Sequence, residues 1–223
     1  MNFDAEKWLA GLNVARGVFV AGTDTEVGKT HVATALIRAL ARLNVRVAGM
    51  KPVAAGAVTT AAGSRNEDAL ALAGAAKVGA PYDLINPYCL PAAVSPHLAA
   101  ADEGVTIEPG VIRESFEALI AQTADFVVVE GAGGWLAPIG ESLTMADVAT
   151  ALGLPVVLVV GLRLGCLNHS LLTKRAIEAS GLEFAGWIGN RIDPHFQRAD
   201  ENIATLERLL DGAALEILPF APC

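Results

Sequence analysis

The sequence predicts an α/β protein in which a predominantly parallel sheet is flanked by helices. Short apolar runs that suit buried strands alternate with stretches of helical spacing, an order typical of a parallel sheet with helices on both faces. Hydrophobic residues make up 53% of the 223 residues but aromatic residues only 5%, which suits closely packed helices on a buried sheet. A glycine-rich turn joins the first strand to the first helix.

The strands are expected in apolar runs that are too short for helices, at residues 18–21, 46–50, 125–130, 155–160, 184–188 and 215–218. The first helix follows the glycine-rich turn and runs to about residue 43. Later helices are expected at residues 67–74, 108–122, 144–152, 168–180 and 197–210. Residues 51–102 are rich in Ala, Gly and Pro, which predicts a long functional loop with short helices. Because no Ser/Gly linker divides the chain, we expect one domain spanning residues 1–223.

Charge and composition argue against several classes of partner. The formal charge is −8 and no Lys/Arg cluster occurs, so we expect no nucleic-acid partner. The most apolar stretch, residues 152–162, is too short to cross a bilayer, and residues 1–17 do not resemble a signal peptide. Cys89, Cys166 and Cys223 lack metal-ligand spacing and suit unpaired thiols in a reducing compartment. We therefore expect a cytoplasmic protein without a membrane segment.

The strongest local motif is Gly-Thr-Asp-Thr-Glu-Val-Gly-Lys-Thr at residues 22–30. It lies between an expected strand and an expected helix, where backbone N–H groups and the helix N-terminus can bind phosphate oxygens. We expect Lys29 to contact the outer phosphates, Thr30 to bind Mg²⁺ and Gly28 to allow close backbone approach. An ordinary turn is the alternative, but an unliganded helix N-terminus disfavours a cation such as Lys29. The motif therefore predicts a fold like that of phosphate-loop NTPases, although Gly22 lies one residue earlier than in the usual spacing.

A second candidate ligand of Mg²⁺ is Glu130, which ends an apolar strand and begins the sequence Glu-Gly-Ala-Gly-Gly. A carboxylate at the carboxyl end of such a strand faces the ligand crevice of an open α/β sheet, and Mg²⁺ prefers oxygen ligands. The adjacent glycines leave space for a ligand. A solvated loop glutamate is the alternative.

Other polar residues lie at expected strand or helix ends, and the residues alone leave their roles open. Lys51 follows the second strand and could neutralise charge during phosphoryl transfer, or it could be a surface lysine. Asp68 opens a helix and competes with Glu67 for any metal role. Asn190, at the end of a strand, could read an adenine edge or serve a turn. The histidines show neither metal spacing nor a nucleophile partner; they are His31, His97, His169 and His195.

Several motifs in order resemble those of the dethiobiotin synthetase family. Besides the phosphate loop they are Lys-Pro-Val-Ala-Ala-Gly at 51–56, Asn-Pro-Tyr at 86–88, Ser-Pro-His at 95–97, Val-Glu-Gly-Ala-Gly-Gly-Trp at 129–135, Gly-Cys-Leu-Asn-His at 165–169 and Gly-Trp-Ile-Gly-Asn at 186–190. The resemblance covers about residues 19–220, and the phosphate loop with one extra residue is itself a feature of the family. Ala55 departs from the family pattern, which often has Ser at this position.

The resemblance implies an enzyme of biotin synthesis that uses ATP, Mg²⁺, CO₂ and 7,8-diaminopelargonate. It implies that Lys29 contacts the phosphates and Lys51 the carbamate and the transferred phosphoryl group. The implied magnesium ligands are Thr30, Asp68 and Glu130. Thr25 and Glu26 would bridge nucleotide and diamine. The implied nucleotide site comprises Thr25, Glu26, Val27, Gly28, Lys29, Thr30, His31, Glu130, Gly133 and Asn190. The family also implies a homodimer in which Gly165, Leu167 and Asn168, at a helix start, bind the diamine's carboxylate across the interface.

Two other functions stay open at this stage. Another phosphate-loop ligase that forms amides could use the same scaffold, although the chain has no room for a Cys–His amidotransferase region. A partitioning ATPase that switches with its nucleotide is the second alternative. Such proteins usually carry a second lysine early in the phosphate loop, and Thr25 and its neighbours supply none.

Overall fold

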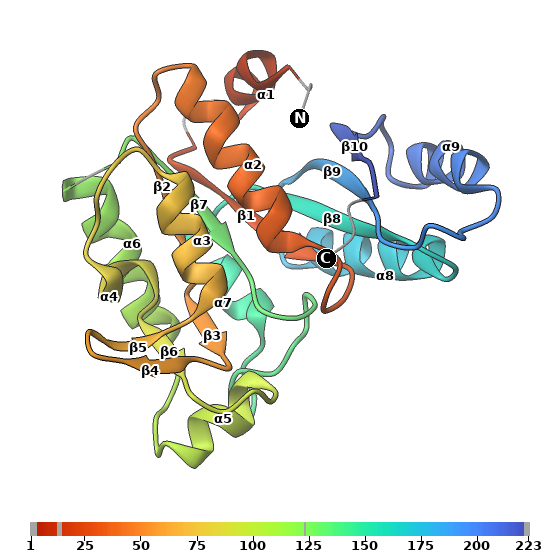
Figure 1. The fold of residues 1–223 in the computed structure, drawn as a ribbon. Coiled ribbons are helices and arrows are strands. Elements are labelled where there is room, and N and C mark those ends of the chain that lie inside the picture. The colour runs from red at the N-terminus through yellow and green to blue at the C-terminus, as the bar shows by residue number, and fades with distance from the viewer. Residues whose placement is uncertain (1–3, 13–14, 123, 221–223) are drawn as a thin grey trace.

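A six-stranded parallel sheet forms the centre of the molecule, in the order β10-β9-β8-β1-β7-β2 (Figure 1). The computed structural model describes residues 4–12, 15–122 and 124–220. The strands of this sheet are β1 (Gly17–Gly22), β2 (Val47–Met50), β7 (Phe126–Glu130), β8 (Val156–Leu162), β9 (Phe184–Arg191) and β10 (Glu216–Leu218). The prediction of a parallel sheet with these strands is confirmed.

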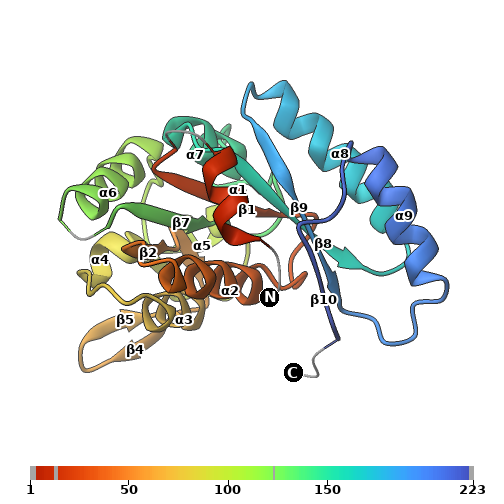
Figure 2. The ribbon, with the colours of Figure 1, turned by 90° about the horizontal axis from the view of Figure 1, so that it is seen from above.

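Helices cover both faces of the sheet, as Figure 2 shows with α2 and α3 on one side and α6, α7 and α8 on the other. On the first side lie α1 (Ala5–Gly11), α2 (Lys29–Arg42) and α3 (Glu67–Ala75). On the second side lie α6 (Pro109–Gln122), α7 (Met145–Leu152), α8 (Cys166–Ala179) and α9 (Ala199–Leu209). Alternate residues of each strand supply the two cores; in β1, Val18 and Val20 pack toward α2, whereas Phe19 and Ala21 pack toward the opposite layer.

The segment between β2 and α6 contains more structure than the sequence predicts. The expected short helices are present as α3, α4 (Tyr82–Ile85) and α5 (Pro96–Asp102). The strands were not predicted: β3 (Val53–Ala55) pairs in parallel with β6 (Tyr88–Leu90), and β4 (Val58–Thr60) forms a hairpin with β5 (Gly63–Arg65). Each has three residues, which is too few to show a periodic pattern. In Figure 1 these strands and α5 lie below the main sheet, beyond the carboxyl ends of its strands.

Two smaller differences concern the N-terminal helix and α8. No element was predicted at residues 5–11, where α1 forms, although Asp4 accepts a hydrogen bond from the Lys7 N–H at 2.9 Å and so marks its start. Helix α8 begins two residues earlier than expected, so that Asn168 lies in its first turn. The expectation for Cys223 lies outside the described residues. In the part of the chain that the structure describes, no helix is long and apolar enough to span a membrane.

The topology creates a crevice at the carboxyl ends of β1 and β7. These strands are neighbours, yet α2, which follows β1, covers one face of the sheet, and α7, which follows β7, covers the other. Where consecutive connections leave an open α/β sheet on opposite faces, the loops separate and leave a ligand site. The phosphate loop and Glu130 begin at these two strand ends.

Candidate active site

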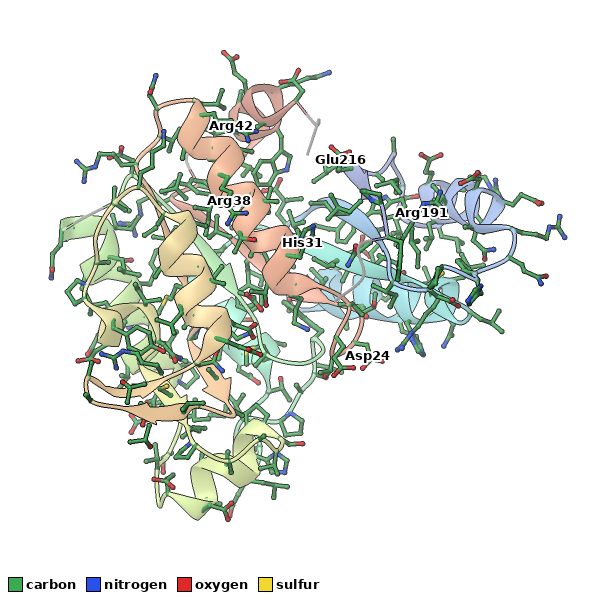
Figure 3. All side chains as sticks on the ribbon, viewed as in Figure 1. Asp24, His31, Arg38, Arg42, Arg191 and Glu216 are labelled. Atoms are coloured by element: carbon green, nitrogen blue, oxygen red, sulfur yellow. The ribbon has the colours of Figure 1, made fainter. Side chains whose placement is uncertain are left out.

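The phosphate loop connects β1 to α2 and is shaped by two residues in the left-handed region. Glu26 has φ 59° and Gly28 has φ 86°, and α2 starts at the next residue. A Cβ atom at Gly28 would lie 2.2 Å from Nδ2 of Asn190, so the position requires glycine for both reasons. Lys29 is only 7% exposed, and its Nζ donates to the carbonyl oxygen of Asp24 at 2.9 Å. Figure 3 labels Asp24 on this loop and His31 on the first turn of α2.

Three oxygen-bearing side chains converge next to Lys29. Oγ1 of Thr30 lies 2.8 Å from Oδ1 of Asp68 and 2.8 Å from Oε1 of Glu130. The Thr30 hydroxyl can donate its single proton to only one of these carboxylates at a time. Its oxygen therefore faces an oxygen of the other carboxylate with no proton between them. Asp68 makes these contacts from the first turn of α3, whereas the Glu67 side chain is exposed.

Lys51 joins the same cluster from the end of β2. Its Nζ donates to Oε1 of Glu130 at 2.6 Å and lies 2.9 Å from Oδ2 of Asp68. Burial acts to lower the pKa of Lys51, but the carboxylates of Glu130 and Asp68 together outweigh burial and hold that pKa above its ordinary value. Lys51 is therefore a buried ammonium group and not the surface lysine that the sequence left open.

The two lysines of the cluster differ in their surroundings. Burial and, secondly, the positive charge of Lys51 lower the pKa of Lys29 to about 8, because the attraction of Glu130, Asp68 and Asp24 does not compensate. For Asp68, burial acts to raise the pKa, but the charge and hydrogen bond of Lys51 and the hydrogen bond of Thr30 lower it below the ordinary value. Lys29 is thus the cation that gains most from an added anion such as a phosphate group.

A hydrogen-bond network that the sequence analysis missed links the backbone at Lys51 to the start of α3. Nδ2 of Asn86 donates to the Lys51 carbonyl oxygen at 2.7 Å, and the Tyr82 hydroxyl lies 3.2 Å from Oδ1 of Asn86. The same hydroxyl accepts from the Asn66 N–H at 2.8 Å, and Oδ1 of Asn66 accepts from the Asp68 N–H at 3.0 Å. The network fixes Lys51 and Asp68 relative to each other. The only sequence signal was the Asn-Pro-Tyr motif at residues 86–88 and an Asn before a helix.

Two further contacts hold the phosphate loop in place. Nδ2 of Asn190, at the end of β9, donates to the Val27 carbonyl oxygen at 3.0 Å, so the Asn190 amide ties the phosphate loop to β9. Asp24 accepts from the Thr25 N–H at 2.8 Å through Oδ1 and from Arg163 at 2.6 Å through Oδ2. Arg163 precedes α8, and neither Asp24 nor Arg163 was predicted to have a role.

The phosphate loop and the cluster of Thr30, Lys51, Asp68 and Glu130 line a cleft of about 640 Å³, whereas Asn190 lies outside its wall. The predicted site residues in its wall are Thr25, Glu26, Gly28, Lys29, Thr30, Lys51, Asp68, Glu130 and Gly133. Ala55 lies in the same wall, together with residues 93–95 of the loop before α5 and Pro96, the first residue of α5. Among the other predicted nucleotide residues, the Val27 side chain packs into the core, whereas His31 is exposed on α2.

The predicted diamine residues lie apart from this cleft, at the start of α8. Gly165 is the N-cap with φ 98°, and Leu167 and Asn168 follow in the first turn. Gly165 and Asn168 are exposed. Leu164 is 89% exposed and Leu172, four residues after Asn168 and hence on the same helix face, is 58% exposed.

The donor set of the cleft fits Mg²⁺. Oxygen atoms of one hydroxyl and two carboxylates come within hydrogen-bond distance of one another, and Mg²⁺ favours such hard oxygen ligands. Oε2 of Glu130 is buried and has no hydrogen-bond partner among the described residues. A buried carboxylate oxygen without a partner is costly, and a cation would satisfy it.

Comparisons with known proteins agree with the geometry. A family model described as an AAA domain matches residues 16–222. The ATP-dependent dethiobiotin synthetase BioD of Aromatoleum aromaticum is 54% identical over 92% of this chain and 90% of its own length. That of Xanthomonas euvesicatoria pv. vesicatoria is 51% identical over 92% of this chain and 91% of its own.

Solved structures with the same fold are more distant in sequence. The septum site-determining protein MinD of Pyrococcus horikoshii, complexed with Mg-ADP, has a TM-score of 0.59 at 18% identity and covers 93% of this chain and 82% of its own. A ParA family ATPase from Chlorobium tepidum has a TM-score of 0.57 at 14% identity, covering 93% and 86%. At these identities the likeness concerns the fold alone.

Proposed function

The chain belongs to the family of ATP-dependent dethiobiotin synthetases, and from that membership we propose that it closes the cyclic urea of dethiobiotin on 7,8-diaminopelargonate with CO₂ and ATP. The structural observation that carries the proposal is the position of Lys51, a buried cation beside a phosphate loop and two carboxylates. The synthetase joins two negatively charged groups, and such a reaction needs cations fixed in place. The chain would act in biotin synthesis in the cytoplasm.

The predicted site residues in and around the cleft would each have a role in the proposed reaction. The phosphate loop and Lys29 would bind the phosphates of ATP, with Thr25 and Glu26 between nucleotide and diamine. Thr30, Asp68 and Glu130 would hold Mg²⁺, which when bound supplies positive charge to the transferred phosphoryl group. Asn190 would support the loop under the nucleotide through its bond to Val27 and face the adenine with the rest of its amide. His31 and Gly133 would border the nucleotide.

The proposed chemistry proceeds without a covalent enzyme intermediate. One amine of the diamine adds to CO₂ and loses a proton to form a carbamate. A carbamate oxygen attacks the γ-phosphorus of ATP and ADP leaves, which gives a carbamic–phosphoric anhydride. The second amine then attacks the carbonyl carbon and loses a proton, phosphate leaves, and the ring closes. Lys29 and Lys51 reduce the repulsion between carbamate and ATP, and the cleft holds the second amine near the carbonyl carbon.

We propose further that the protein is a homodimer in which the start of α8 completes the partner's site. Gly165, Leu167 and Asn168 lie outside the cleft but next to exposed apolar side chains, as residues of an interface do. The N-terminus of α8, a helix of 14 residues, would receive the carboxylate of the diamine through its N–H groups.

Mass spectrometry of the product tests the function. The purified protein is incubated with 7,8-diaminopelargonate, ATP, Mg²⁺ and ¹³C-labelled bicarbonate. We expect labelled dethiobiotin and an equal amount of ADP. In Lys51→Gln the rate should fall at least about 100-fold, because one preorganised charge is lost in a dry site. Lys77→Gln is the matched control, since Lys77 is an exposed lysine outside the cleft.

Two outcomes would contradict the proposal. Hydrolysis of ATP without labelled product, by protein shown to be folded, would favour the nucleotide-switch ATPase. Equal rates in Lys51→Gln and Lys77→Gln would contradict the proposed role of Lys51 but not the proposed reaction.

A further inference from the structure

We propose that Lys51 and a divalent cation compete for the carboxylates of Asp68 and Glu130, so that the metal enters the cleft together with the nucleotide and not before it. This inference rests on the proposed function, in which these two carboxylates bind Mg²⁺. It adds a binding order and a second role for Lys51, which is to exclude the free metal.

The contacts of Lys51 engage oxygen atoms that a metal would need. Its Nζ lies 2.6 Å from Oε1 of Glu130 and 2.9 Å from Oδ2 of Asp68, while Thr30 takes the other oxygen of Asp68 and shares Oε1 of Glu130. Mg²⁺ binds oxygen at about 2.0–2.1 Å. A metal ion and the Lys51 ammonium group, if bound to the same pair of carboxylates, would therefore lie within a few ångströms of each other. The two positive charges would then repel each other with no solvent between them.

One oxygen atom of the cluster is available without displacing Lys51. Oε2 of Glu130 is buried and has no hydrogen-bond partner among the described residues. It offers an entering cation its first ligand. Asp68, the second carboxylate, becomes available only when its bonds to Lys51 and Thr30 are exchanged.

The charges of the cleft decide when this exchange is favourable. Two buried lysines, Lys29 and Lys51, face two carboxylates, Asp68 and Glu130, so the cluster is close to neutral. Glu26 and Glu67 also line the cleft, but both are exposed to solvent, and Asp24 is half-exposed and pairs with Arg163. A free divalent cation would add two positive charges to this neutral buried set, which desolvation and repulsion both oppose. Magnesium bound to ATP brings a net negative charge and gives both lysines phosphate oxygens as new partners.

Lys51 then has a defined path from one role to the other. While it is bound to Asp68 and Glu130 it satisfies both carboxylates. If a metal bound these oxygen atoms, the ammonium group of Lys51 would need another acceptor within reach of the Lys51 side chain. Gly131 offers a carbonyl oxygen at 3.4 Å, and the carbamate and the γ-phosphate supply stronger acceptors. The exchange thus turns Lys51 toward the reacting groups only when the nucleotide is present.

Binding of Mn²⁺ to nucleotide-free protein tests the proposal, with free Mn²⁺ followed by electron paramagnetic resonance at pH 7. We expect Lys51→Met to bind Mn²⁺ at least about tenfold more tightly than the wild type, because the carboxylates lose their competitor. Lys29→Met is the matched control: it removes an equal charge from the same cleft, but the Lys29 ammonium contacts the Asp24 carbonyl oxygen and neither of the two carboxylates. Its affinity for Mn²⁺ should stay within about threefold of the wild-type value.

Addition of ADP gives the second arm of the test. In the wild type, ADP should tighten Mn²⁺ binding at least about tenfold, and in Lys51→Met by clearly less. Equal Mn²⁺ affinities of wild type and Lys51→Met without nucleotide would overturn the proposal. An equal gain in Mn²⁺ affinity over the wild type in Lys29→Met and Lys51→Met, again without nucleotide, would also overturn it. The total charge of the cleft, and not competition, would then set the affinity.

Loss of a buried charge can unfold a variant, so the wild type provides an independent measurement. Mg²⁺ alone should leave its melting temperature unchanged, whereas Mg²⁺ with ADP should raise it more than ADP alone does. A rise with Mg²⁺ alone would contradict the inference. Neither experiment contains diamine or bicarbonate. A failed product assay therefore refutes the proposed function, whereas a failed metal titration refutes the competition.

Discussion

The phosphate cleft and the start of α8 are built in opposite ways. In the cleft Lys51 and Glu130 are buried, and each proposed ligand contacts another one: Thr30, Lys51, Asp68 and Glu130 form one hydrogen-bonded cluster. At the start of α8, Gly165 and Asn168 are exposed beside the apolar side chain of Leu164. The difference fits the proposed homodimer, in which the diamine half of the site would gain its surroundings from a second chain.

The largest expected effect concerns the cleft. Gly28→Ala would place a Cβ atom 2.2 Å from Nδ2 of Asn190 at a φ of 86°, so the loop must deform. Strain of this kind costs about 1–3 kcal/mol, and with the clash we expect a loss of ATP affinity of about 100-fold, measured by isothermal titration calorimetry. Gly74→Ala is the control, since Gly74 lies in α3 with open space around it. ATP affinity within threefold of wild type in Gly28→Ala would show that the loop is not preformed.

The next effect should separate the two regions. Leu164→Glu places a charge on the exposed apolar surface before α8. We expect the proposed dimer to dissociate, as measured by light scattering, and the KM for the diamine to rise about tenfold, which corresponds to about 1.4 kcal/mol, while the Kd for ATP stays unchanged. Val111→Glu, on the exposed side of α6, should change none of these quantities. An intact dimer in Leu164→Glu would place the interface elsewhere.

The smallest expected effect concerns the hydrogen-bond network through Tyr82, beside the cleft. Tyr82→Phe removes the hydroxyl that links Asn66 to Asn86, and with it the coupling between Lys51 and Asp68. We expect the free energy of unfolding to fall by about 1–2 kcal/mol and kcat to fall a few-fold, with the Kd for ATP unchanged. Denaturant melts and steady-state kinetics measure both. Tyr88→Phe removes a hydroxyl that accepts from the Glu108 N–H outside this network, so an equal loss of kcat there would contradict the role of Tyr82.

The sequence predicts the parallel sheet and most of the cleft because a simple rule connects them. The carboxyl ends of parallel strands meet at one edge, so Lys51, Glu130 and the phosphate loop could be assigned to the same side before any coordinates were known. The choice between Asp68 and Glu67 stayed open from the residues alone, because both lie in the first turn of α3. Only the direction of each side chain separates them: Asp68 points at Thr30 and Glu67 is exposed.

The supporting residues could not be predicted for a different reason. Asn66, Tyr82 and Asn86 bond mainly to backbone groups, and those groups meet only after β3 and β6 have paired. The pair Asp24–Arg163 joins loops that are 139 residues apart in the sequence. No periodicity or spacing in a single sequence records such contacts. The Asn190 side chain illustrates the same limit, since its position at a strand end was visible but its bond to Val27 was not.

The position of β7 in the sheet has a consequence for how the protein is made. β1 and β2 are joined directly by α2, yet they do not touch, because β7 lies between them. A chain that has emerged from the ribosome only as far as residue 125 lacks the strand that bridges them. In the cleft, Thr30 and Glu130 contact each other although they are 100 residues apart in the sequence. The nascent chain must therefore keep its first βα units unpaired until β7 arrives, an interval in which chaperone binding would be most useful.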